Sequence, residues 1–119
     1  MPLDYLLFES TDEETGACSF DAMASVLADR LPALIHEVET VLGWACLDFG
    51  APSSVEESGE WDFELQAVAE QDVPLEITYD CERAMISMPR VPGRVTLALT
   101  LTGSPAFAAA FTETFPDSD

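Results

Sequence analysis

The sequence predicts an α+β protein: a two-layer sandwich with one long and one short helix on one face of an antiparallel sheet. Three observations lead to this fold class. Several segments alternate apolar and polar residues, as half-buried strands do. One segment, 31–49, has helical periodicity instead. The predicted order is β-β-α-β-β-β-β-α, with short connections between the later strands. The chain has 119 residues and a hydrophobic content of 48%, which predicts a single domain, 1–119, with one core.

Two strands are predicted before the long helix. Residues 4–10 (DYLLFES) form the first, and the acidic segment 11–16 (TDEETG) is predicted to be a turn. In 18–26, alanine and methionine favour helix, but the apolar residues alternate as in a strand: Phe20, Ala22, Ala24 and Val26. We therefore predict a strand that forms a hairpin with the first.

The segment 31–49 is predicted to be the long helix. Pro32 suits its first turn, where the missing N–H costs nothing. Gly50 and Pro52 are a strong stop signal. Spacing of about 100° per residue puts one apolar stripe on the face that must pack on the sheet: Leu31, Leu34, Ile35, Val38, Val41, Leu42, Ala45 and Phe49.

Beyond a loop at 51–59, four further strands are predicted, at 60–69, 73–80, 84–88 and 94–102. Their short connections carry turn residues, so we expect antiparallel neighbours arranged as a meander. The last strand should bury one side: Val95, Leu97, Leu99 and Leu101. A short helix should follow Ser104, its N-cap, with one phenylalanine face: Phe107, Phe111 and Phe115.

The net charge restricts the partners. The chain has 23 acids, four arginines and no lysine, giving −19. Such a surface repels nucleic-acid phosphates and anionic lipid, so we expect no direct nucleic-acid binding and no membrane binding. Residues 56–82 hold ten acids and no base, whereas residues 83–112 hold three arginines and no acid. A basic protein or a cation is the natural partner for this charge.

The cysteines and the N-terminus favour a cytoplasmic protein. Cys18, Cys46 and Cys81 are far apart and odd in number, so we expect reduced, mostly buried thiols rather than a disulfide framework. The first residues, MPLDYLLFES, lack the basic region of a signal peptide. No apolar run approaches the roughly 20 residues that span a bilayer.

We predict no catalytic residue, no cofactor and no dedicated metal site. The single histidine, His36, should point outward from the helix. The absence of lysine excludes a P-loop and Schiff-base chemistry. No nucleophile motif is present. Asp12, Glu13 and Glu14 lack the spacing of an EF-hand loop, so a solvated turn is favoured over a cation site there.

Two surfaces are candidates for binding. Asp62, Glu64, Glu76 and Asp80 should stand on the solvent face of two adjacent strands. Such acids serve either solubility, which is favoured, or docking of a basic partner. Trp44 and Leu47 should lie away from the core side of the long helix, where they either form an apolar contact site or are covered by the 51–59 loop or the final helix.

The leading functional hypothesis is a small, acidic, non-enzymatic, bacterial-type interaction protein, with an immunity, inhibitor or nucleic-acid-mimic role as its most concrete version. The competing class binds a small ligand or a divalent cation through a surface carboxylate cluster. A third hypothesis is a homodimer built on Trp44 and Leu47.

Overall fold

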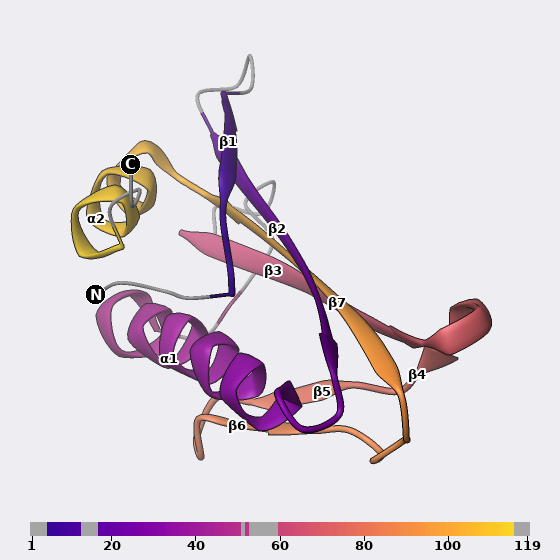
Figure 1. Ribbon diagram of the computed structural model, residues 1–119. Coiled ribbons are helices and arrows are strands. Elements are labelled where there is room, and N and C mark those ends of the chain that lie inside the picture. The colour runs from indigo at the N-terminus through magenta and orange to yellow at the C-terminus, as the bar shows by residue number, and fades with distance from the viewer. Residues whose placement is uncertain (1–4, 13–16, 51, 53–59, 116–119) are drawn as a thin grey trace.

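The structure, a computed structural model, describes residues 5–12, 17–50, 52 and 60–115. It confirms the α+β class and the predicted order of strands and helices, with the predicted strand 73–80 divided into two (Figure 1). The strands are β1 (Glu9–Asp12), β2 (Cys18–Leu27), β3 (Trp61–Ala69), β4 (Val73–Leu75), β5 (Thr78–Asp80), β6 (Met85–Ser87) and β7 (Arg94–Gly103). The helices are α1 (Leu31–Phe49) and α2 (Pro105–Thr114), and a 3-10 turn, Glu70–Asp72, joins β3 to β4.

The main sheet is antiparallel and five-stranded, with the order β1-β2-β7-β3-β4. The expected meander is wrong, because the last strand lies between β2 and β3 rather than beside β6 (Figure 1). The lengths explain this arrangement. A central strand must be long enough to pair along both edges, and β7 matches β2 over ten residues, whereas β4, β5 and β6 have three residues each.

Two predicted strands have different bounds in the structure. The predicted strand 73–80 is divided: β4 pairs with β3, while β5 pairs with β6 in a separate two-stranded hairpin. The predicted first strand 4–10 is mostly wrong, because β1 begins at Glu9. Tyr5 and Leu6 contact α1 instead, because the Glu37 carboxylate on this helix accepts hydrogen bonds from their backbone N–H groups.

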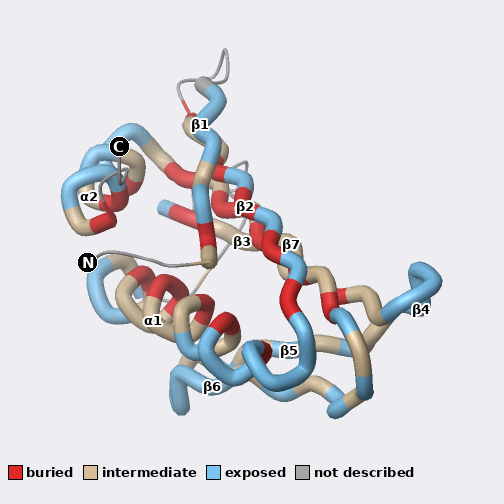
Figure 2. Tube along the Cα trace, viewed as in Figure 1, coloured by how far each residue is buried: buried red, intermediate tan, exposed pale blue. Residues whose placement is uncertain are grey.

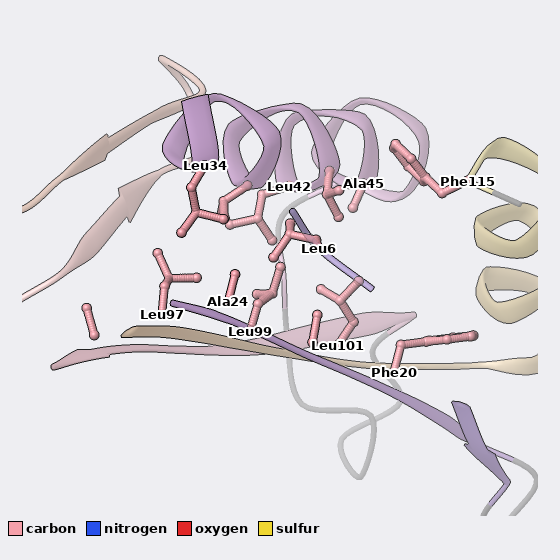
Figure 3. Close-up of a cluster of buried hydrophobic side chains, with 14 of the residues drawn as sticks. Leu6, Phe20, Ala24, Leu34, Leu42, Ala45, Leu97, Leu99, Leu101 and Phe115 are labelled. Carbon is pink, nitrogen blue, oxygen red and sulfur yellow. The ribbon is translucent and has the colours of Figure 1, made fainter. Parts of the chain in front are cut away.

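The core lies between the main sheet and a layer formed by α1, α2 and the β5–β6 hairpin (Figure 1). Every inward position of β7 is buried, as the alternation predicts. Facing them on α1 is the buried part of the predicted stripe: Leu31, Leu34, Val38, Val41, Leu42 and Ala45 (Figure 3). Buried residues follow α1, β2, β3 and β7, whereas β4, β5 and β6 contain none (Figure 2).

The final helix closes one end of this core. The Ser104 hydroxyl accepts a hydrogen bond from the Phe107 N–H at 3.2 Å, which confirms the predicted N-cap. Phe107, Phe111 and Phe115 are all buried. Gly103 permits the close approach of α2, because a Cβ there would overlap the Phe107 ring. The phenylalanine face of α2 therefore belongs to the core.

The cysteine prediction is wrong for two of the three residues. Cys46 on α1 and Cys81 in the turn between β5 and β6 form a disulfide, with their Sγ atoms 2.04 Å apart. The two residues are 35 positions apart, and only the docking of the hairpin on α1 brings them together. Cys18 is half-buried at the start of β2 and is not part of this disulfide. The disulfide fixes the hairpin to α1.

Candidate interaction surface on the open face of the sheet

The side of the main sheet turned away from α1 carries small and polar side chains. Alternate residues of a strand point to opposite faces, so the residues between the buried positions of each strand make up this side. We call it the open face, and its strand residues are Glu9 and Thr11 on β1, Ser19, Asp21, Met23, Ser25 and Leu27 on β2, Arg94, Thr96, Ala98, Thr100 and Thr102 on β7, and Asp62, Glu64, Gln66 and Val68 on β3. None of the described residues in this set is buried.

A row of acids crosses the open face. The strand register aligns Glu9 with Asp21, Asp21 with Thr100, and Thr100 with Glu64. With strands about 4.8 Å apart, this row spans about 14 Å. Asp62 lies two residues from Glu64 on β3 and adds a fourth carboxylate. One side of the sheet thus presents four acids within a small area.

Among the described residues, no cation pairs with the carboxylates of this row. The Asp21 carboxylate accepts a hydrogen bond of 2.7 Å from the Thr100 hydroxyl. In the part of the chain that the structure describes, the one ion pair joins Arg83 to Asp80, away from the open face. The nearest base on this face is Arg94, six residues along β7 from Thr100, or about 20 Å. Its guanidinium donates to the Ser25 carbonyl at 3.2 Å. Directly opposed like charges such as Glu9 and Asp21 destabilise a sheet by some tenths of a kcal/mol.

Exposed apolar side chains lie beside the acids. Leu7 is 64% exposed and Met23 is 69% exposed. Together with Ala98 and Thr100 they line a shallow hollow of about 390 Å³, whose other walls include Glu9 and Asp21. Methionine is enriched in protein interfaces, where its flexible side chain adapts to a partner. The open face therefore combines an apolar hollow with an acidic rim.

The structure separates the four acids predicted to form one surface. Asp62 and Glu64 lie on the open face, as expected from the alternation in β3. Glu76 lies between β4 and β5, outside the main sheet. Asp80 ends β5, where its carboxylate accepts hydrogen bonds from the N–H groups of Glu82 and Arg83 and so shapes the hairpin turn. The predicted placement on two adjacent strands is therefore wrong for Glu76 and Asp80.

Trp44 and Leu47 differ in their surroundings, and a homodimer built on them remains a prediction. The Trp44 ring is half-buried and lies 5.7 Å from the Phe107 ring and 5.5 Å from the Phe115 ring, centroid to centroid. The final helix thus covers Trp44, which was one of the two predicted alternatives. Leu47 is 89% exposed. A single exposed leucine is ordinary on a protein surface.

His36 and the possible metal ligands were the remaining candidates for chemistry. His36 is exposed on α1, as predicted. Among the side chains that the structure describes, no group of three or more histidine, cysteine, aspartate or glutamate residues is placed to hold a metal ion. Glu13 and Glu14 lie outside the described residues. No helix in the described part of the chain has the length and apolarity needed to cross a membrane.

Sequence reasoning missed half of the open face. Asp21 and Met23 have the parity opposite to Phe20, Ala22 and Ala24, so the alternation in β2 already indicates that both point to solvent. Their proximity to Glu64 could not be foreseen, because it depends on β7 lying between β2 and β3. The contribution of Leu7 and Glu9 depends on the pairing of β1 with β2.

Comparisons of the chain with protein-family models, with curated proteins and with solved structures find no match. The chemistry of the open face is therefore the basis for a functional proposal.

Proposed function

We propose that this protein is a non-enzymatic interaction module that docks a basic protein partner on the open face of its sheet. The observation that carries the proposal is the apolar hollow at Leu7 and Met23, bordered by the carboxylates of Glu9 and Asp21. Solubility alone requires charge but no exposed apolar hollow within it. A docking site requires both, because an interface combines an apolar centre with a polar rim.

The electrostatics support a basic partner. The chain carries −19, so oppositely charged proteins are attracted over long distances at low salt, and their association is accelerated. Glu9 and Asp21 repel one another across the β1–β2 pair. A lysine or arginine of a partner placed between them relieves this repulsion. The complementary segment thus presents an apolar side chain flanked by cations.

An inhibitor of a basic nucleic-acid-binding protein is the most concrete version of this role. Such a partner has a surface that already accepts phosphates, and the acidic row offers it carboxylates instead.

The cytoplasmic location remains a prediction, and the disulfide between Cys46 and Cys81 argues against it, since disulfides persist mainly in oxidising compartments.

Calorimetric titration with a short arginine-rich peptide that has one central leucine tests the proposal. The open-face variant replaces three acids (Glu9→Gln, Asp21→Asn and Glu64→Gln), and a matched control replaces three exposed acids elsewhere (Asp29→Asn, Asp48→Asn and Glu82→Gln). Both variants have the same net charge. We expect the open-face variant to bind about tenfold more weakly than the control. Equal affinities would contradict the proposal.

A second comparison isolates the apolar hollow. Replacing the central leucine of the peptide with serine should weaken binding to the wild type. The same replacement should have little effect on a Met23→Ser variant, which has already lost the exposed methionine from the hollow. Equal losses in both proteins would show that the hollow takes no part in docking.

A further inference from the structure

A second hollow lies on the opposite layer of the molecule, between the start of α1 and the segment that leads from β6 to β7. We call it the α1–β6 groove. It has a volume of about 670 Å³. The β2–α1 turn and the first turns of α1 form one wall, and residues 86–92 form the other. Figure 1 shows β6 running beside the first turns of α1.

The walls of this groove are mostly apolar. Leu31 and Ile35 come from α1, and Ile86, Met88 and Val91 face them from the other side. Four of these five side chains are only half-buried, and Leu31 is buried. Pro32, Pro89 and Pro92 also line the groove, and their fixed φ angles limit the conformations of its walls. The volume lies within the range of small-molecule sites, which are largely apolar with few polar groups.

The charged group of the groove is a cation, and the polar residue Ser87 also lines it. Among the described residues that line it, Arg90 is the charged one and none is a carboxylate, although the chain has 23 acids. Arg90 belongs to the segment 83–112, which contains no acid. Arg30 directly precedes α1, and the N-terminus of the helix adds partial positive charge. Asp29 is exposed in the adjoining turn and does not line the groove.

We infer that the α1–β6 groove binds an aliphatic chain that ends in a single anionic group. The apolar walls take the chain, and the Arg90 guanidinium takes the anion, for which it has several N–H donors. The groove carries a cation and the open face carries acids, so the groove is a separate site for a ligand of opposite charge. A cationic ligand would be repelled by Arg90, and a fully polar anion would leave the apolar walls without a partner.

Titration of isotope-labelled protein with decanoate, followed by NMR, tests this inference. The salt concentration should be 0.15 M, because the Debye length of about 8 Å then screens the distant acids more than a contact with Arg90. We expect saturable shifts at residues 31–35 and 86–92, with a Kd below about 1 mM. Acetate should produce no saturable shift, because it lacks the chain. Absence of saturable shifts with decanoate below its micelle concentration would overturn the inference.

Charge at Arg90 is tested by a matched pair of variants. Arg90→Gln should weaken decanoate binding by about fivefold and leave decanol binding unchanged. Arg83→Gln removes the same charge from the exposed hairpin turn outside the groove, and should leave both affinities unchanged. Equal decanoate affinity in the two variants, or decanol binding as tight as decanoate in the wild type, would overturn the role of the anion.

Decyl phosphate distinguishes two possible anionic head groups of the ligand. Tighter binding than decanoate would assign a phosphate head group, and weaker binding would assign a carboxylate. Either result supports the groove as the site if decanoate and decyl phosphate shift the same residues. Shifts confined to the open face with both ligands would contradict it. Because these ligands are anions, failure here leaves the docking of a basic partner untouched.

Discussion

Replacing Cys81 with serine is expected to lower the free energy of unfolding by about 4 kcal/mol. The Cys46–Cys81 disulfide joins residues 35 positions apart. For a loop of this length, the entropy that the crosslink removes from the unfolded chain corresponds to about 4 kcal/mol at 25 °C. This is a large share of the roughly 5–15 kcal/mol that stabilises an ordinary domain.

The contacts of the hairpin determine how the variant responds locally. Without the disulfide, the remaining links to α1 include the hydrogen bond of 2.9 Å from the Ile86 N–H to the Glu39 carboxylate. Neither β5 nor β6 contains a buried residue. We therefore expect hydrogen exchange at the amide of Ile86 to accelerate far more than exchange in β7.

Urea unfolding without reductant, followed by circular dichroism, measures the effect. Cys18→Ser is the matched control, because Cys18 is outside the disulfide, and its unfolding free energy should change much less. The m-value of Cys81→Ser should rise, since the unfolded chain becomes less compact. A loss below about 0.5 kcal/mol would refute the loop-closure reasoning. Three titratable thiols in the unfolded, unreduced wild type, instead of one, would refute the disulfide itself.

Three further predictions concern the core, a helix cap and an alkaline titration. Leu99→Ala, at a fully buried position of β7, should lower the free energy of unfolding by about 3 kcal/mol in urea, because it leaves a cavity. Ser104→Ala removes the N-cap of α2 and should cost about 1 kcal/mol by the same assay. Burial, and then the carboxylates of Glu39 and Asp80, raise the pKa of Tyr79 above its ordinary value of 10.0. Because the folded pKa is the higher one, the stability from Tyr79 is complete below about pH 10 and is lost as the pH rises through the folded value. The Tyr79 hydroxyl is buried and has no hydrogen-bond partner among the described residues, so Tyr79→Phe should unfold no more easily than wild type at pH 8 and should lose less stability at pH 10.5. A greater loss in the phenylalanine variant at high pH would contradict this.

The local elements could be predicted from the sequence because their signals lie within the elements themselves. The bounds of α1 match the predicted 31–49, since Pro32 and Gly50 mark its ends and the apolar stripe fixes its inner face. The inward side of β7 is buried as its alternation predicts. These features depend on residues within a few positions of one another.

The tertiary arrangement depends on residues far apart in the sequence, and there the predictions were less accurate. The insertion of β7 between β2 and β3 overturned the meander. The same insertion brought Asp21 into one row with Glu64 and left Asp80 in a separate hairpin. The disulfide of Cys46 likewise follows from the docking of that hairpin on α1. No local pattern in the sequence indicates contacts between residues so far apart.

The central claim, that the open face is the docking surface, is tested most directly by mapping where a basic ligand binds. Isotope-labelled protein would be titrated at 0.15 M salt with the arginine-rich peptide that has one central leucine, and the backbone amide shifts recorded by NMR. We expect the largest shifts at Leu7, Glu9, Asp21, Met23 and Thr100, around the hollow. Shifts spread evenly over all acidic surfaces, or concentrated on α1 and the β5–β6 hairpin, would contradict the claim.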